Sequence, residues 1–176
     1  MPADNLPTSA APSAGARIAW ATQSRRAHGQ LSRLLAPHPL RLLGLAEGLF
    51  IRQQVLEHYR VATHAGHMLT QDLPHWDALA PALHQALQAV PGLQAPTAAA
   101  DADWTLLVQD ADTRGVYTLS ANGFADRAAA LLRWDGNSLL LAAPGLRSGV
   151  LLDCEVSDQG SVTLQLERWS ADGWPG

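Results

Sequence analysis

The spacing of apolar residues along the chain changes near Pro96. Before this proline, apolar residues recur at three- and four-residue spacing, which is typical of amphipathic helices. After it, they alternate with polar residues or form short blocks, which is typical of β-strands. The pattern predicts an α+β protein, with N-terminal helices packed on one face of a C-terminal antiparallel β-meander of about five to six strands.

The first half of the chain predicts three helices bounded by prolines and glycines. They cover residues 18–36, about 40–61 and about 79–90. Gly44 and Gly48 fall inside the second helix, where glycine costs stability. Their presence predicts that another helix packs closely against this one.

The domain organisation follows from composition. Residues 1–16 are rich in proline, alanine and serine and predict a disordered tail. Residues 17–176 then form a single α+β domain, with a helical part at 17–92 and a β part at 103–170.

The second half predicts short strands separated by turn residues. The strands cover 104–109, 115–120, 128–134, 138–142, 150–157 and 161–169. Asp-Gly-Asn at 135–137 and Asp-Gln-Gly at 158–160 predict tight turns between antiparallel neighbours. A lone sheet also has two edges, and pairing of an edge strand across a two-fold axis would form a homodimer.

The amino-acid composition excludes several kinds of catalytic site. All 12 basic residues are arginines, so no lysine is present to form a Schiff base or a phosphate-loop contact. Abundant alanine, leucine, glycine and proline indicate GC-rich coding and a bacterial source. The stretch 78–100 is uncharged but contains prolines and glutamines, which argues against a membrane span. Without a recognisable signal peptide, we expect cytoplasmic residence.

The charges are unevenly placed. Seven arginines lie between Arg17 and Arg60, against two glutamates, whereas the sequence after Asp77 holds eleven acids and five arginines. The first two helices carry an arginine face, with Arg25, Arg26, Arg33 and Arg52 as its candidate partner-binding residues. This face is either solvated, paired with the acidic sheet, or bound to an acidic protein. The pI near 5.9 and the lack of a binding motif argue against nucleic acid.

Tryptophan is over-represented, with six residues against two phenylalanines and two tyrosines. Trp20 and Trp104 fall at expected core positions. Trp169 lies on the polar side of the last strand and Trp174 in the terminal segment, so both are harder to bury. Either one covers a sheet edge of its own chain or docks a partner, as tryptophan often does at interfaces.

The densest polar cluster spans His58 to His75. His64, His67 and His75 within it, together with a nearby carboxylate, could hold a metal ion, or they could simply be solvated histidines in a connection. On the polar face of the fifth strand, Asp153 and Glu155 form a carboxylate pair with potential acid–base use. The single cysteine, Cys154, excludes an internal disulfide.

No serine elbow, phosphate loop or dinucleotide-binding fingerprint is present in the sequence. We therefore expect a non-enzymatic bacterial protein-binding factor without a cofactor: an adaptor, a chaperone-like protein or an inhibitor. The alternative is a small-molecule or metal-binding module, or an enzyme, whose site lies between helices and sheet and uses the His58–His75 cluster.

Overall fold

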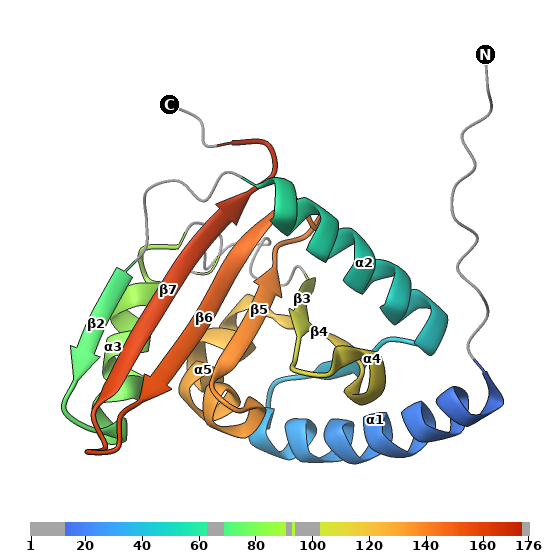
Figure 1. Cartoon of the computed structure of the whole chain (residues 1–176), viewed down its shortest axis with the longest axis horizontal. Coiled ribbons are helices and arrows are strands. Elements are labelled where there is room, and N and C mark those ends of the chain that lie inside the picture. Colours follow the sequence, from blue (N-terminus) through green and yellow to red (C-terminus); the bar gives the residue numbers. More distant parts are fainter. Residues whose placement is uncertain (1–12, 63–68, 91–92, 94–102, 174–176) are drawn as a thin grey trace.

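The strands form one seven-stranded antiparallel sheet in the order β1-β4-β3-β5-β6-β7-β2 (Figure 1). The computed structural model describes residues 13–62, 69–90, 93 and 103–173. The strands are β1 (Leu40–Leu42), β2 (Leu69–Leu73), β3 (Asp103–Leu107), β4 (Val116–Ser120), β5 (Ser138–Ala142), β6 (Ser148–Val156) and β7 (Val162–Ser170). The predicted α+β class with an antiparallel sheet is confirmed.

Helices lie on both faces of the sheet (Figure 1). They are α1 (Ala14–Leu35), α2 (Leu45–Val61), the 3₁₀ turn η1 (Trp76–Ala78), α3 (Leu79–Leu87), α4 (Ala111–Arg114) and α5 (Ala121–Asp135). The side chains of α1, α3 and α5 share a large apolar core with one face of the sheet. The expected position on that same face is wrong for α2, because its apolar residues pack on the opposite face in a smaller core.

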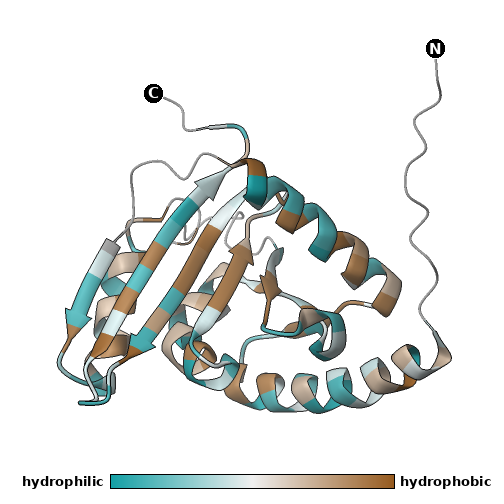
Figure 2. Ribbon diagram, viewed as in Figure 1, coloured by the Kyte–Doolittle hydropathy of each residue, from teal (hydrophilic) through white to brown (hydrophobic). Residues whose placement is uncertain are grey.

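The central strands explain why two cores form. In β3 and β4, neighbouring residues that point to opposite faces are buried, for example Leu106 and Leu107, or Val116 and Tyr117. Figure 2 shows this concentration of apolar residues in the centre of the sheet. A strand that is apolar on both sides requires a cover on both sides, and α2 supplies the second one.

Both edge strands come from the first half of the chain, where residues 40–42 were expected to be helical and residues 69–73 to lie in the connection between two helices. Leu40–Leu42 pairs with β4, and Leu69–Leu73 pairs with β7. The predicted second helix therefore begins at Leu45 rather than near residue 40. Gly48 does allow close packing, but against a strand: a Cβ there would lie 3.5 Å from the Cβ of Val116.

The predicted strand at 128–134 is wrong, because these residues belong to α5. The Ser120 side chain accepts a hydrogen bond from the Gly123 N–H and caps the helix, and Gly136 ends it with a φ of 85°. The short apolar run inside α5 fits a strand or a buried helix equally well, so periodicity alone does not distinguish them.

The remaining boundaries are close to the predictions. The turn at 158–160 joins β6 and β7, and Cys154 pairs with Leu164 across this hairpin. The turn at 135–137 instead ends α5 and leads into β5. At the N-terminus, the predicted disordered tail lies mostly outside the described residues, but α1 already begins at Ala14 because Ser13 accepts a hydrogen bond from the Ala16 N–H.

Candidate binding groove

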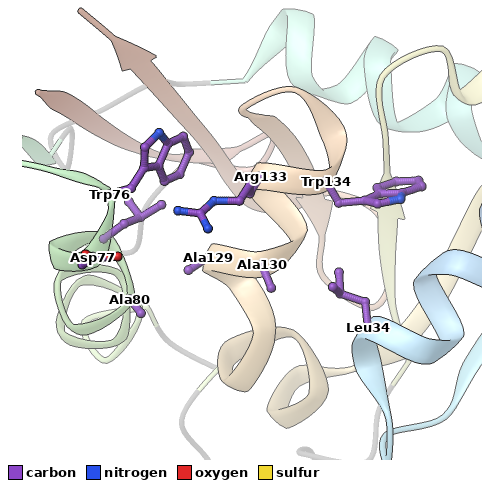
Figure 3. Close-up of a pocket in the computed structure, with 9 residues that line it drawn as sticks. Leu34, Trp76, Asp77, Ala80, Ala129, Ala130, Arg133 and Trp134 are labelled. Atoms are coloured by element: carbon purple, nitrogen blue, oxygen red, sulfur yellow. The ribbon is translucent and has the colours of Figure 1, made fainter. Parts of the chain in front are cut away.

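A groove of about 590 Å³ lies on the outer side of the helical layer, where α1 and η1–α3 flank α5 (Figure 3). Its floor consists of small side chains, Ala129 and Ala130 of α5. Its sides are apolar and large: Trp76 from η1, and Trp134 with Leu34 toward α1. The groove is thus shaped to accept apolar groups that lie along α5.

The pattern of α5 produces this floor. The helix turns its buried residues, among them Phe124, Leu131 and Leu132, toward the sheet. Alanines at 129 and 130 then occupy positions between its neighbours. Because these alanine side chains end at Cβ, they leave an open space along the surface of α5 between α1 and α3.

Trp76 and Arg133 form one side of the groove. The Arg133 guanidinium carbon lies 4.9 Å from the centroid of the Trp76 ring, and in Figure 3 this side chain reaches toward the indole. Such cation–π contacts contribute about 0.5–1 kcal/mol when exposed. Among the residues that the structure describes, no carboxylate forms an ion pair with Arg133.

Trp134 is fixed from two sides. Its indole Nε1–H donates to Gln30 Oε1 at 3.2 Å, and the Arg114 guanidinium stacks on its ring at 4.1 Å from the centroid. Arg114 in turn donates from Nη1 to Asp135 Oδ1 at 2.8 Å. These contacts hold the second tryptophan of the groove in one orientation.

Asp135 supports this arrangement from inside the protein. Only 2% of this residue is exposed, and its other oxygen accepts a hydrogen bond from the Gln109 backbone N–H at 2.7 Å. Burial raises the pKa of Asp135 to about 7, although the Gln109 N–H and the Arg114 guanidinium both favour the charged form. The carboxyl group therefore titrates near neutral pH.

The predicted arginine face is divided by the fold. Arg25, Arg26 and Arg33 are exposed on α1, which carries no acidic residue. Arg52 lies on α2, across the sheet, and is half-buried. The structure therefore places Arg25, Arg26 and Arg33 on one helix and separates Arg52 from them.

Of the two alternatives for Trp169, the structure shows burial within its own chain and not an exposed docking residue. Its side chain is fully buried and makes an edge-to-face contact with Tyr59 of α2, with ring centroids 5.7 Å apart. Strand alternation does place Trp169 on the same face as Thr163 and Glu167, but α2 covers that end of the face. Trp174 lies outside the described residues. Trp104 is buried as expected, and Trp20 is half-buried.

Sequence reasoning missed the residues that form the groove: Trp76, Trp134 and Arg133. Trp134 falls within a run that reads as a strand, and Trp76 and Arg133 are far apart in the chain, so no local pattern connects them. The excess of tryptophan was the only signal, and it did not identify which of these side chains meet.

The histidine cluster is only partly described. His64 and His67 lie outside the described residues, His75 is exposed just before η1, and the His58 ring nitrogen Nδ1 is 2.7 Å from the Leu146 carbonyl oxygen. Within the described ranges, no group of three or more His, Cys, Asp or Glu residues is placed to hold a metal ion. Asp153 and Glu155 point away from the large core, on the side of the sheet opposite α5.

None of the described helices combines the length and the apolarity needed to span a membrane. Comparisons with known proteins add no functional assignment: the chain matches no family model and no curated protein sequence.

Proposed function

We propose that this chain is a non-enzymatic protein-binding factor, of adaptor, chaperone-like or inhibitor type, whose groove receives an acidic amphipathic segment of another protein. The observation that carries the proposal is the combination in one groove of an alanine floor, two tryptophans and Arg133, a cation without a carboxylate partner among the described residues.

The apolar part of the groove supports the binding of a helical or extended segment. Apolar side chains of that segment would pack on Ala129 and Ala130, between Trp76 and Trp134. Tryptophan at such a position commonly contributes a large share of interface affinity, because its large ring loses its contact with water on binding. Grooves of this kind recognise amphipathic helices through apolar anchors at helical spacing.

The charges support an acidic segment over a basic one. Arg133 is positioned to meet a carboxylate at the edge of the groove, and Arg33 precedes the groove residue Leu34 on the arginine-bearing helix α1. The α1 arginines add a positive potential that attracts an acidic partner over a distance and is screened by salt. Asp77 is the only acidic side chain among the residues lining the groove.

The sequence-based expectations of a bacterial source and cytoplasmic residence belong to this proposal, as does a homodimer. The sheet ends in β1, with three residues, and β2, with five, and each pairs with one strand among the described residues. Pairing of β2 with its copy would extend the sheet across a two-fold axis. Light scattering that gives the monomer mass at high protein concentration would contradict the homodimer.

The test uses a synthetic amphipathic peptide with leucines at helical spacing and glutamates elsewhere, and a matched peptide with lysines in place of the glutamates. We expect the acidic peptide to bind, measured by fluorescence anisotropy, and the lysine peptide not to bind. Arg133→Glu should weaken binding about tenfold or more, because it replaces an attraction with a repulsion at close range. Arg60→Glu, the same charge change on α2, should weaken it less than about twofold.

A second pair of variants tests the apolar floor. Ala130→Trp should abolish binding by filling the groove, whereas Ala46→Trp on the exposed side of α2 should leave binding unchanged. Equal binding of both peptides would reject the proposal, because charge would then not select the partner. Equal loss in Arg133→Glu and Arg60→Glu would also reject it, because the interaction would then depend on overall charge alone.

A further inference from the structure

A second, smaller pocket lies next to Trp134, which contacts two of its lining residues, Gln30 and Arg114. It has a volume of about 370 Å³ and is lined by Gln23, Arg26, Ala27, Gln30 and Arg114. The α1 residues recur at positions 23, 26, 27 and 30, which places them on one face of the helix. Arg114 reaches the pocket from α4. Two arginines from different elements and two glutamines thus line the same pocket.

The charged residues that line the pocket are all positive. No carboxylate is among its lining residues. Arg26 is exposed and has no ion-pair partner within the described part of the chain. Arg26 and Arg114 are the charged residues that line this pocket, and Asp135 pairs with Arg114 only, so the arrangement favours a bound anion.

Two donors of the pocket, Arg114 and Gln30, are held in place before any ligand arrives. Arg114 is fixed by its ion pair with Asp135 and by stacking on Trp134, and Nη1 alone is used for that ion pair. Gln30 accepts the Trp134 indole N–H on Oε1, so its Nε2 amide hydrogens remain available to a ligand. Preorganised donors lower the entropy cost of binding.

We infer that this pocket binds a phosphoryl group, held between the guanidinium groups of Arg26 and Arg114 with additional hydrogen bonds from Gln23 and Gln30. A phosphate monoester carries about −1.5 to −2 charges at neutral pH and three acceptor oxygens, which suit two guanidinium forks that approach from different directions. A single carboxylate would be satisfied by one of these forks.

The phosphoryl group has two sources that share this chemistry. It belongs either to a free phosphate compound or to a phosphorylated side chain of the segment in the groove, since Trp134 borders the groove and contacts both Gln30 and Arg114 of the pocket. Only the second source rests on the proposed function.

The first experiment titrates the isotope-labelled full chain with inorganic phosphate at constant ionic strength and follows the tryptophan indole N–H signals by NMR. We expect a saturable shift of the Trp134 signal, because its N–H bonds to Gln30, and no shift of Trp169, which is buried on the opposite face. Arg26→Gln should weaken phosphate binding about tenfold, whereas Arg25→Gln, the same change at the next exposed residue of α1, should weaken it less than about twofold.

Three results would overturn the inference: shifts that grow linearly without saturation, equal effects of Arg26→Gln and Arg25→Gln, or the same shifts with acetate in place of phosphate. Folding of each variant is checked by thermal unfolding. Because no peptide is present, this experiment can succeed where the groove test fails, and the reverse also holds.

The second experiment separates the two sources. The acidic peptide of the groove test is compared with the same peptide carrying one phosphoserine. A phosphorylated segment as ligand predicts tighter binding by about tenfold, a gain that Arg26→Gln removes and Arg25→Gln retains. Equal affinity of the two peptides, together with saturable binding of inorganic phosphate, assigns the pocket to a free phosphate compound instead.

Discussion

The two faces of the sheet differ in how completely they are covered. On one face, α1, α3 and α5 bury a continuous core, and α5 alone buries seven of its 15 residues. On the other face, α2 buries only Gly48 and Val55 of its 17 residues, and much of its outer surface, including Phe50, is exposed. The strands supply alternate side chains to both faces, so the difference in burial comes from the number of helices that pack on each face.

The two faces also differ in charge. The α1 helix on the well-covered side carries arginines and no acidic residue. Asp72, Asp153, Glu155 and Glu167 lie on the other side, since they alternate with the strand residues of the large core. The exposed arginines of α1 and these strand carboxylates therefore lie on opposite sides of the sheet, and α2 adds Arg52 and Arg60 to the side of the carboxylates.

Gly149 is the position where a substitution should destabilise the smaller core most, because there is no room for a side chain. A Cβ at this position would lie 2.0 Å from the Leu141 carbonyl oxygen and 2.9 Å from ring carbons of Trp169. We expect Gly149→Ala to lower the free energy of unfolding by about 4 kcal/mol or more. Urea denaturation followed by tryptophan fluorescence measures this loss.

Gly29→Ala is the matched control, because a Cβ at Gly29 of α1 meets nothing within 4 Å. This change should stabilise the protein by up to about 1 kcal/mol through its higher helix propensity. If Gly149→Ala were as stable as the wild type, the smaller core would have to be loose enough to move away from the new methyl group.

Two buried leucines, one in each core, allow the stability of the two cores to be compared directly. Leu31 in the large core and Leu43 in the small core are both essentially unexposed. We expect Leu31→Ala to cost about 3–4 kcal/mol and Leu43→Ala about 2–3 kcal/mol, because a core that is open at one side can relax around the missing atoms. The same denaturation experiment measures both values. A larger loss at Leu43 would show that α2 is held as rigidly as the other helices.

Much of the fold could be predicted from local patterns. The amphipathic spacing in α1 and α3 and the alternation in β6 and β7 identify these elements, because each buries one side. The edge strands could not be predicted, since Leu40–Leu42 and Leu69–Leu73 are short and are defined by pairing with distant strands. Helix α5 was missed because its apolar run at 128–134 lacks a distinctive period.

Some of the candidate site residues could likewise be predicted from local patterns, and others could not. Helical spacing alone predicts that Arg25, Arg26 and Arg33 are exposed, and the structure has them so. Burial of Trp169 could not be predicted, because it depends on α2 crossing to the second face. The groove likewise requires Trp76 and Arg133 to meet through tertiary packing, which no pattern along the chain encodes.

The well-covered face holds a titratable group that makes stability depend on pH. The pKa of Asp135 is raised by burial to about 7, above its value in the unfolded chain, so the folded protein retains a proton that the unfolded chain has lost. The contribution is fully present below about pH 4 and is lost as the pH rises through about 7. We expect Asp135 to lower the free energy of unfolding by about 2 kcal/mol between about pH 5 and pH 8.

Asp135→Asn isolates this effect. The asparagine oxygen can still accept from the Gln109 N–H, but the side chain no longer titrates in this range. The difference in unfolding free energy between wild type and variant should therefore change with pH in favour of the variant as the pH rises. A constant difference would mean that the Arg114 ion pair keeps Asp135 charged throughout.

The smallest effect is expected on the outer surface of α2, where Phe50 is 61% exposed. Phe50→Ser should change the free energy of unfolding by no more than about 0.5 kcal/mol, because little buried area is lost. The same substitution at Phe124, which is fully buried on α5, should unfold or strongly destabilise the protein. Thermal and urea unfolding compare the two variants. A large loss at Phe50 would mean that something covers this surface in solution, and if that cover is a second copy of the chain, the loss would shrink as the protein is diluted.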